Sequence, residues 1–188
     1  VDGEPTPDRN DEYLFYPTLV GAWPGGSVNE VELAGFRERI VACMEKAIKE
    51  AKVHTSWVNP NEAYDRAVES FVRQVLVVED SDGFLNDFNQ FHQNLAFAGM
   101  LNSLAQTLFK MTAPGVPDFS QGTELWDLSL VDPDNRRPVD FAKRRSLLED
   151  LKRRESVDRA GLLGDLLSRW QDGRVKLYLV YKALRFRR

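Results

Sequence analysis

The sequence has little of what disulfides, metal sites, membranes and nucleic acids require. Its single cysteine, Cys43, excludes an internal disulfide and a cysteine-rich zinc site, and its two histidines, His54 and His92, lie far apart. It has no run of about 18 apolar residues and no apolar segment of the secretory type. Its 25 basic and 29 acidic residues are spread along the chain, without a sustained basic face. These absences predict a cytoplasmic protein with no metal, no cofactor, no nucleic-acid partner and no membrane contact.

Helical periodicity is what the sequence does contain, and it predicts a mainly α fold. Apolar residues recur every three or four positions through seven ranges, with capping residues, glycines and prolines between them. Asp11 is expected to cap the first helix, Ser27 or Asn29 the second, and Pro60 suits the first turn of the third. The expected ranges are 11 to about 23, a second helix through 33–48, 61 to about 78, 82–111, 141–154, 158–170, and 174 onward.

Two of these helices carry predictions about burial. Cys43 falls on the apolar stripe of the second helix and is expected to be a small core residue, not a reactive thiol. In the fourth helix one stripe continues for about seven turns, which is typical of a central, mostly buried helix. Its members are Phe84, Phe88, Phe91, Leu95, Ala98, Leu101, Leu104, Leu108 and Met111.

The two ends of the sequence are typical of a fragment. The chain begins at Val1 without a methionine and stops inside the amphipathic run 174–184 and its basic tail, with no capping glycine or asparagine. We therefore expect it to be a piece of a larger protein.

Polar and turn-forming residues gather at 113–126 and 130–140, between strongly helical flanks. Carboxylate, amide and guanidinium groups bind neighbouring hydroxyls of a polyol in pairs, and an indole such as Trp126 or Trp57 covers the apolar face of a sugar ring. One hypothesis is therefore a sugar-binding loop. Its candidate binding residues are Asp118, Gln121, Glu124, Asn135, Arg136 and Arg137.

The alternative hypothesis needs no ligand. The residues 132–135 have the composition of a plain turn, whose carboxylates would pair with Arg136 and Arg137 to hold the loop. Spacing in the sequence cannot place two carboxyl groups across a glycosidic bond, so both hypotheses stay open on composition alone.

A resemblance to known sequences favours the sugar-binding loop over the plain turn. The run Pro-Gly-Val-Pro-Asp-Phe-Ser-Gln-Gly-Thr-Glu-Leu at 114–125 resembles the last barrel strand and following loop of the α-amylase superfamily. The fuller run 114–141 is similar specifically to the maltooligosyl trehalose synthase family, as are 10–24, 52–62 and 172–177. These stretches extend over nearly the whole chain, and the resemblance is to the C-terminal portion of that family.

The resemblance implies a (β/α)8 barrel enzyme, an isomerase that converts the reducing-end α-1,4 link of a maltooligosaccharide into an α,α-1,1 link. Such an enzyme resembles a retaining glycosidase: an Asp forms a glycosyl-enzyme, a Glu serves as acid and then base, and the released glucose attacks in place of water. In that frame, 1–112 would be four helices inserted after the seventh strand, 113–140 the eighth strand and substrate loop, and 141–188 the C-terminal barrel helices.

The family's three catalytic carboxylates follow earlier barrel strands, so the resemblance implies no catalytic residue in this chain and no activity in isolation. Its partners would be the maltooligosaccharide substrate and the missing N-terminal barrel portion. A short strand is expected at 116–119, which without neighbours would be irregular or paired with another chain. A second hypothesis, from a different class, is a helical carbohydrate-binding or protein-interaction module without catalysis.

Overall fold

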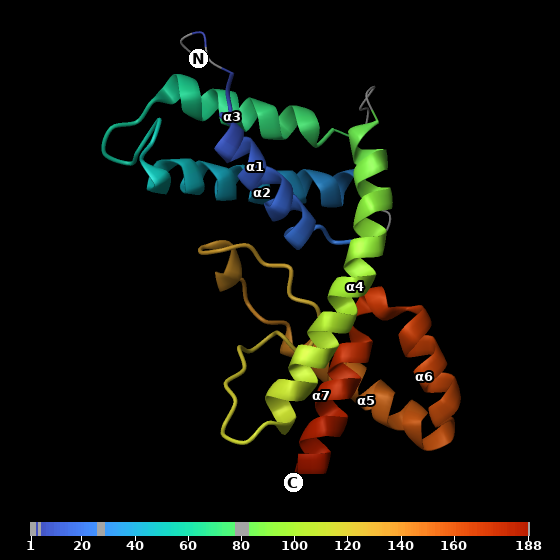
Figure 1. Cartoon of the computed structure of the whole chain (residues 1–188). Helices are drawn as coiled ribbons and strands as arrows, with labels where there is room; N and C mark the ends of the chain where they lie inside the picture. Colours follow the sequence, from blue (N-terminus) through green and yellow to red (C-terminus); the bar gives the residue numbers. More distant parts are fainter. Residues whose placement is uncertain (1–2, 4, 26–28, 78–82, 188) are drawn as a thin grey trace. The chain divides into compact units, whose positions relative to one another are not determined.

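The computed structural model describes residues 3, 5–25, 29–77 and 83–187, and the chain divides into two compact units (Figure 1). Unit 1 comprises Val1–Gln93 and Leu128–Arg136, and unit 2 comprises Asn94–Asp127 and Arg137–Arg188. The long helix α4, Phe84–Thr112, begins in unit 1 and continues in unit 2. The polar segment between α4 and the next long helix is therefore divided between the two units.

Unit 1 is held by capped helices around an aromatic core. Asp8 accepts hydrogen bonds from the N–H groups of Asn10 and Asp11, and Asn29 forms a reciprocal capping box with Glu32. The α2 and α3 helices lie side by side in Figure 1. The bounds are α1 Arg9–Ala22, α2 Glu30–Ala51, α3 Glu62–Val75 and the short helix η1 Asp134–Arg136.

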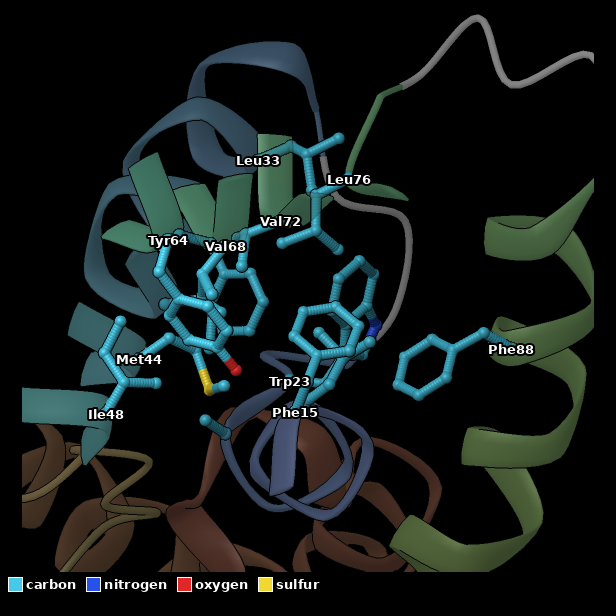
Figure 2. Packing of buried hydrophobic residues seen from close by; sticks show 14 residues of the cluster. Phe15, Trp23, Leu33, Met44, Ile48, Tyr64, Val68, Val72, Leu76 and Phe88 are labelled. Carbon is cyan, nitrogen blue, oxygen red and sulfur yellow. The ribbon is translucent and has the colours of Figure 1, made fainter. Parts of the chain in front are cut away.

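The core of unit 1 is closely packed between these helices, as Figure 2 shows. The Trp23 ring contacts Phe36 and Phe88 edge-on, with centroids 5.2 and 5.1 Å away. Its buried residues also include Phe15, Leu33, Met44, Ile48, Tyr64, Val68, Val72 and Leu76.

Unit 2 packs three helices around a smaller leucine-rich core. Asp140 caps α5 through the N–H of Lys143, and Asp158 caps α6 through the N–H of Gly161. The buried members of the core are Leu125, Leu151, Leu162, Leu166, Leu177 and Tyr178. The bounds are α5 Phe141–Val157, α6 Arg159–Ser168, η2 Trp170–Asp172 and α7 Arg174–Arg187. Leu125 brings the polar loop into this core and so fixes its position on unit 2.

The mainly α prediction is confirmed, and two of its helix limits need correction. Asp11 does not cap α1; it lies inside the helix, where its buried carboxylate accepts a hydrogen bond from the Tyr64 hydroxyl at 2.6 Å. Pro60 precedes the cap Asn61 and does not occupy the first turn. The positions Ser27, Val78 and Ser81, expected near helix limits, lie outside the described residues.

Two predictions of burial are wrong in part. Cys43 is half-buried, because Met44, one position along α2, takes the core position. In α4, Phe88 and Met111 are buried, but Leu101 and Leu108 are exposed. The apolar stripe of α4 is therefore only partly covered by the residues that the structure describes.

The segment 116–119 does not form the expected strand and takes the irregular form that was expected for a strand without neighbours. The described part of the chain contains helices, turns and irregular segments and no strand, and Val116 is 99% exposed. A lone strand would leave its backbone N–H and C=O groups unpaired, so an irregular segment that water can reach is the favourable form. Among the described residues, no helix has the length and apolarity needed to cross a membrane.

Candidate functional site

The loop before α5 is ordered by a tight turn in unit 2. The backbone N–H and the hydroxyl of Thr123 both donate to the carbonyl of Ser120, at 3.3 and 2.7 Å. Gly122 has a φ of +97°, and a Cβ there would lie 3.1 Å from Cγ2 of Val139. Only glycine adopts this conformation in this space without strain. The turn therefore holds Glu124 in a defined place.

The Glu124 carboxylate is held in place by hydrogen bonds from its own loop and from α5. Its Oε2 accepts a hydrogen bond from Nε of Arg144 at 3.0 Å and one from the N–H of Gly122 at 3.1 Å. Arg144 also donates to the carbonyl oxygens of Gly122 and Asp140. The side chains of Arg144 and Glu124 are 19% and 33% exposed, so the pair is partly shielded from solvent. The carboxylate is thus pre-oriented, which a binding or positioning group requires.

A hollow of about 450 Å³ opens beside this carboxylate, within unit 2. Hydroxyl groups and an amide line it together with Glu124, and burial lowers the pKa of Lys176 on α7, an effect that Asp127 and Glu124 oppose. The uncharged polar side chains are Ser103, Gln106, Thr107, Ser120 and Thr123, and the cations are Lys110 and Lys176. A hollow of this size with several convergent donors and acceptors is suited to a polyol.

A second and larger hollow, of about 1000 Å³, also has Glu124 in its lining and follows α5 and α7. Its apolar floor includes Leu148 and Leu177, and cationic groups surround Tyr181. Glu124 therefore lines two hollows of unit 2, and the smaller one combines hydroxyl and amide groups with apolar side chains, Met111, Phe119, Val180 and Leu184.

The six candidate binding residues are divided between the two units. Asp118, Gln121, Glu124 and Arg137 belong to unit 2, where Asp118, Gln121 and Arg137 are exposed. Asn135 and Arg136 belong to η1 of unit 1 and are also exposed. Of the six, Glu124 is the one in the lining of the polar hollow.

The unit 1 part of the segment is held to α2 by cations. Asp134 accepts two hydrogen bonds from Arg39, at 3.0 and 2.9 Å, and a third from the N–H of Leu130 at 2.7 Å. Nζ of Lys46 donates to the carbonyl of Asp132 at 2.7 Å. Arg136 forms an ion pair with the Asp132 carboxylate. The turn-holding role considered for Asp132 is therefore present, and Asp134 is held to α2 by Arg39.

The two tryptophans considered as sugar platforms differ in their surroundings. The Trp126 indole N–H donates to the carbonyl of Trp170 at 2.7 Å, and Nζ of Lys176 lies 5.6 Å from its ring centroid. Trp57 is 58% exposed, with Nζ of Lys49 at 4.6 Å from its ring centroid. Trp126 is held in place by its hydrogen bond to Trp170, and Trp57 keeps an accessible ring.

One polar network was missed by sequence reasoning. In unit 1, Nε2 of His54 lies 2.7 Å from Oδ2 of Asp8, and the imidazole stacks on Tyr64 with centroids 4.4 Å apart. Tyr64 in turn donates to Asp11, and burial together with this bond raises its pKa. The partners lie 46 and 53 positions apart in the sequence, so no local pattern indicates them. Across the described residues, no three His, Cys, Asp or Glu side chains gather as metal ligands would.

Comparisons with known proteins agree with the resemblance seen in the sequence. No family model matches the chain. Two curated proteins, from two strains of Mycobacterium tuberculosis, have a name that assigns them to maltooligosyl trehalose synthase. Each is 40% identical to this chain over 152 residues, and the match covers 79% of this chain and 18% of the relative. A crystal structure of maltooligosyl trehalose synthase is 38% identical with a TM-score of 0.82, covering 97% of this chain and 23% of its own. The Arthrobacter ramosus maltooligosyltrehalose synthase structure is 37% identical with a TM-score of 0.76, covering 100% and 22%.

The class that these matches define is that of trehalose-forming synthases. The chain belongs to the maltooligosyl trehalose synthase family. It spans about a fifth of the length of the relatives that it matches.

Proposed function

We propose that this chain is the C-terminal portion of a (β/α)8 barrel maltooligosyl trehalose synthase and contributes part of its substrate site. The whole enzyme would convert the reducing-end α-1,4 link of a maltooligosaccharide into an α,α-1,1 link. The observation that carries the proposal is the polar hollow beside Glu124, in the segment whose sequence resembles the family. A pre-oriented carboxylate and several hydroxyl groups are the groups that recognise a glucose unit.

The resemblance to the family suggests which roles this chain and the rest of the enzyme would have. The nucleophilic Asp, the acid/base Glu and a third carboxylate would be supplied by the portion of the enzyme outside this chain. Asp118, Gln121, Glu124, Asn135, Arg136 and Arg137 would line the sugar side of the loop. No cofactor is needed, because the reaction exchanges one acetal oxygen for another without a change in oxidation state. The cytoplasmic location expected from the sequence stays a prediction.

The test is an assay of maltopentaose conversion. We expect no product from the purified chain, and a trehalose-capped product from a chimera in which the chain replaces the matched segment of the Arthrobacter ramosus synthase. Loss of reducing ends reports transfer, and free glucose, measured separately, reports hydrolysis. Turnover by the isolated chain would show that catalytic carboxylates are present in it.

The binding-module hypothesis predicts a different outcome. A module without a role in catalysis would bind maltopentaose in isolation, and loop substitutions would leave the turnover of the chimera unchanged. The fragment hypothesis predicts that turnover depends on the loop. Comparing chimeras with wild-type and substituted loops therefore separates the two functions.

A further inference from the structure

Helix α4 has a second apolar face that the described structure covers only in part. We define the α4 stripe as Phe97, Leu101 and Leu108, whose exposed fractions run from 43% to 49%. All three lie in the part of α4 that belongs to unit 2, where Phe97 makes one edge-on contact, with Trp170 at 6.1 Å between centroids. Single exposed apolar residues are ordinary, but a row of three large ones along one face of a helix is not.

This stripe is distinct from the face by which α4 packs in unit 2. Met100, Thr107 and Met111 are buried, at 4%, 9% and 1% exposure. Successive residues of an α-helix are about 100° apart around the helix axis. The centre of this buried group therefore lies about 80° around the axis of α4 from the centre of the group Phe97, Leu101 and Leu108. Apolar side chains thus cover a wider arc than a surface helix needs, which is typical of a helix enclosed on more than one side.

Charge is also absent along this stretch of α4. From residue 88 to residue 109 the sequence contains no Asp, Glu, Lys or Arg. A solvated helix face normally carries such residues, because they stay hydrated and keep the surface from associating. The apolar face of this stretch therefore has no charged neighbours to keep it hydrated, although Ser103, Gln106 and Thr107 on another face are polar.

We propose that the α4 stripe is a docking face for the part of the synthase chain that lies outside this sequence. This inference rests on the proposed function. The length of the relatives argues for this occupant, because the chain spans only 18% to 23% of the proteins that it matches and about four fifths of each remains to cover it. A second copy of this chain is the competing occupant.

The experiment is hydroxyl-radical footprinting read by mass spectrometry, which reports the exposure of individual side chains without any substitution. The isolated chain at low concentration is compared with the Arthrobacter ramosus chimera. We expect oxidation of the α4 stripe to be about 5-fold or more slower in the chimera, because packed interiors exclude solvent. Met100 and Met111, buried within unit 2, serve as internal controls and should react slowly in both samples.

Equal oxidation rates at the stripe in the two samples would overturn the proposal. Protection in the isolated chain that disappears on dilution, together with a dimer mass, would assign the stripe to a second copy and would also overturn it. If the chimera does not fold, as judged by circular dichroism, the same measurement on the unmodified Arthrobacter ramosus synthase decides. Exposed side chains at its aligned positions would then count against the proposal, and protected ones would support it.

Activity is measured in parallel, so that failure of this inference and failure of the proposed function give different results. A protected stripe in a folded chimera without trehalose-capped product would leave the docking face standing and contradict the function. An exposed stripe in an active chimera would support the proposed function and contradict the docking face.

Discussion

Arg144 on α5 donates its Nε–H to the Glu124 carboxylate at 3.0 Å, although twenty positions separate the two residues. The same guanidinium donates to the carbonyl of Gly122. Because both side chains are partly shielded from solvent, this pair is worth more than an exposed one. It is a polar contact that ties the candidate substrate loop to the helical body of unit 2, beside the packing of Leu125 and the hydrogen bond of Trp126.

Arg144→Ala is expected to lower the free energy of unfolding by about 1–3 kcal/mol, because the Glu124 carboxylate and the Gly122 carbonyl lose their donor. Urea unfolding followed by circular dichroism measures this. Arg145→Ala, at an exposed position on the same helix, is the matched control and should have a much smaller effect. Equal losses in the two variants would contradict the structural role of Arg144.

Gly122→Ala is expected to destabilise the chain by about 1–2 kcal/mol, because its φ of +97° is unfavourable for any residue with a Cβ and Val139 lies in the way. Gly164→Ala is the control. It lies inside α6, and its added Cβ would meet no atom within 4 Å. That change should raise stability by about 0.5–1 kcal/mol through helix propensity. Thermal unfolding of the two variants should thus shift in opposite directions, and a shift in the same direction would refute the assignment of the turn.

Arg39→Lys should weaken the attachment of 128–136 to α2, because a lysine cannot make the paired hydrogen bonds that Arg39 makes to Asp134. We expect a loss of about 1 kcal/mol in unfolding free energy. Arg66→Lys changes an exposed pair with Glu62 and should be close to neutral. Hydrogen exchange at the Leu130 N–H, which donates to the Asp134 carboxylate, measures the local stability of this segment. Unchanged exchange there would show that Arg39 does not hold the segment.

Asp8 should make the chain sensitive to acid. Hydrogen bonds from the Asp11 N–H and from His54 hold the pKa of Asp8 below its ordinary value of 3.8. A carboxyl group with a lowered pKa in the folded state stabilises the fold above its unfolded pKa, so its contribution is complete well above pH 3.8. That contribution falls as the pH drops through 3.8 and is gone below the folded pKa.

Asp8→Asn tests this directly, because asparagine also caps a helix but does not titrate. The variant should lose less stability than the parent between neutral pH and pH 2–3, measured by thermal unfolding across that range. Glu62→Gln, which removes one exposed carboxylate, controls for the change in net charge. Identical acid dependence of parent and Asp8→Asn would argue against this role of Asp8.

Glu124→Ala and Arg136→Ala, made in the active chimera, should each lower kcat/KM about 10-fold or more if these side chains bind the sugar. The comparison with Arg144→Ala separates contact from positioning at Glu124. If Glu124 touches the sugar, its own removal should cost clearly more than removal of the arginine that orients it. Unchanged kinetics in both Glu124→Ala and Arg136→Ala would reassign the two residues to loop structure.

Much of the local structure could be predicted from the sequence, because it depends on neighbours along the chain. The helix caps show both where prediction from near neighbours succeeds and where it fails. Asn29 is the cap of α2 as its capping box with Glu32 indicates, but Asp8, not Asp11, caps α1. Asp11 has a partner 53 positions away in Tyr64, and a pattern of near neighbours carries no information about such a contact.

The candidate site shows a similar division. Glu124 was a candidate because its loop resembles that of a known family and because a carboxylate suits a polyol. The sequence gives no indication that Arg144 would hold it or that Ser103 and Thr107 of α4 would line the same hollow. Nor does it indicate that Arg39 and Lys46 would attach 128–136 to α2 and so divide the candidate residues between two units.

What the sequence determined by itself is the helical character of the chain, most of its helices and its family. These follow from periodicity, capping residues and a long run of matching residues, all of which are read along the chain. Only the tertiary structure decided which apolar faces are covered, which carboxylates are paired and whether 116–119 forms a strand. Those outcomes depend on groups that are distant in sequence, since burial and ion pairing are set by proximity in space.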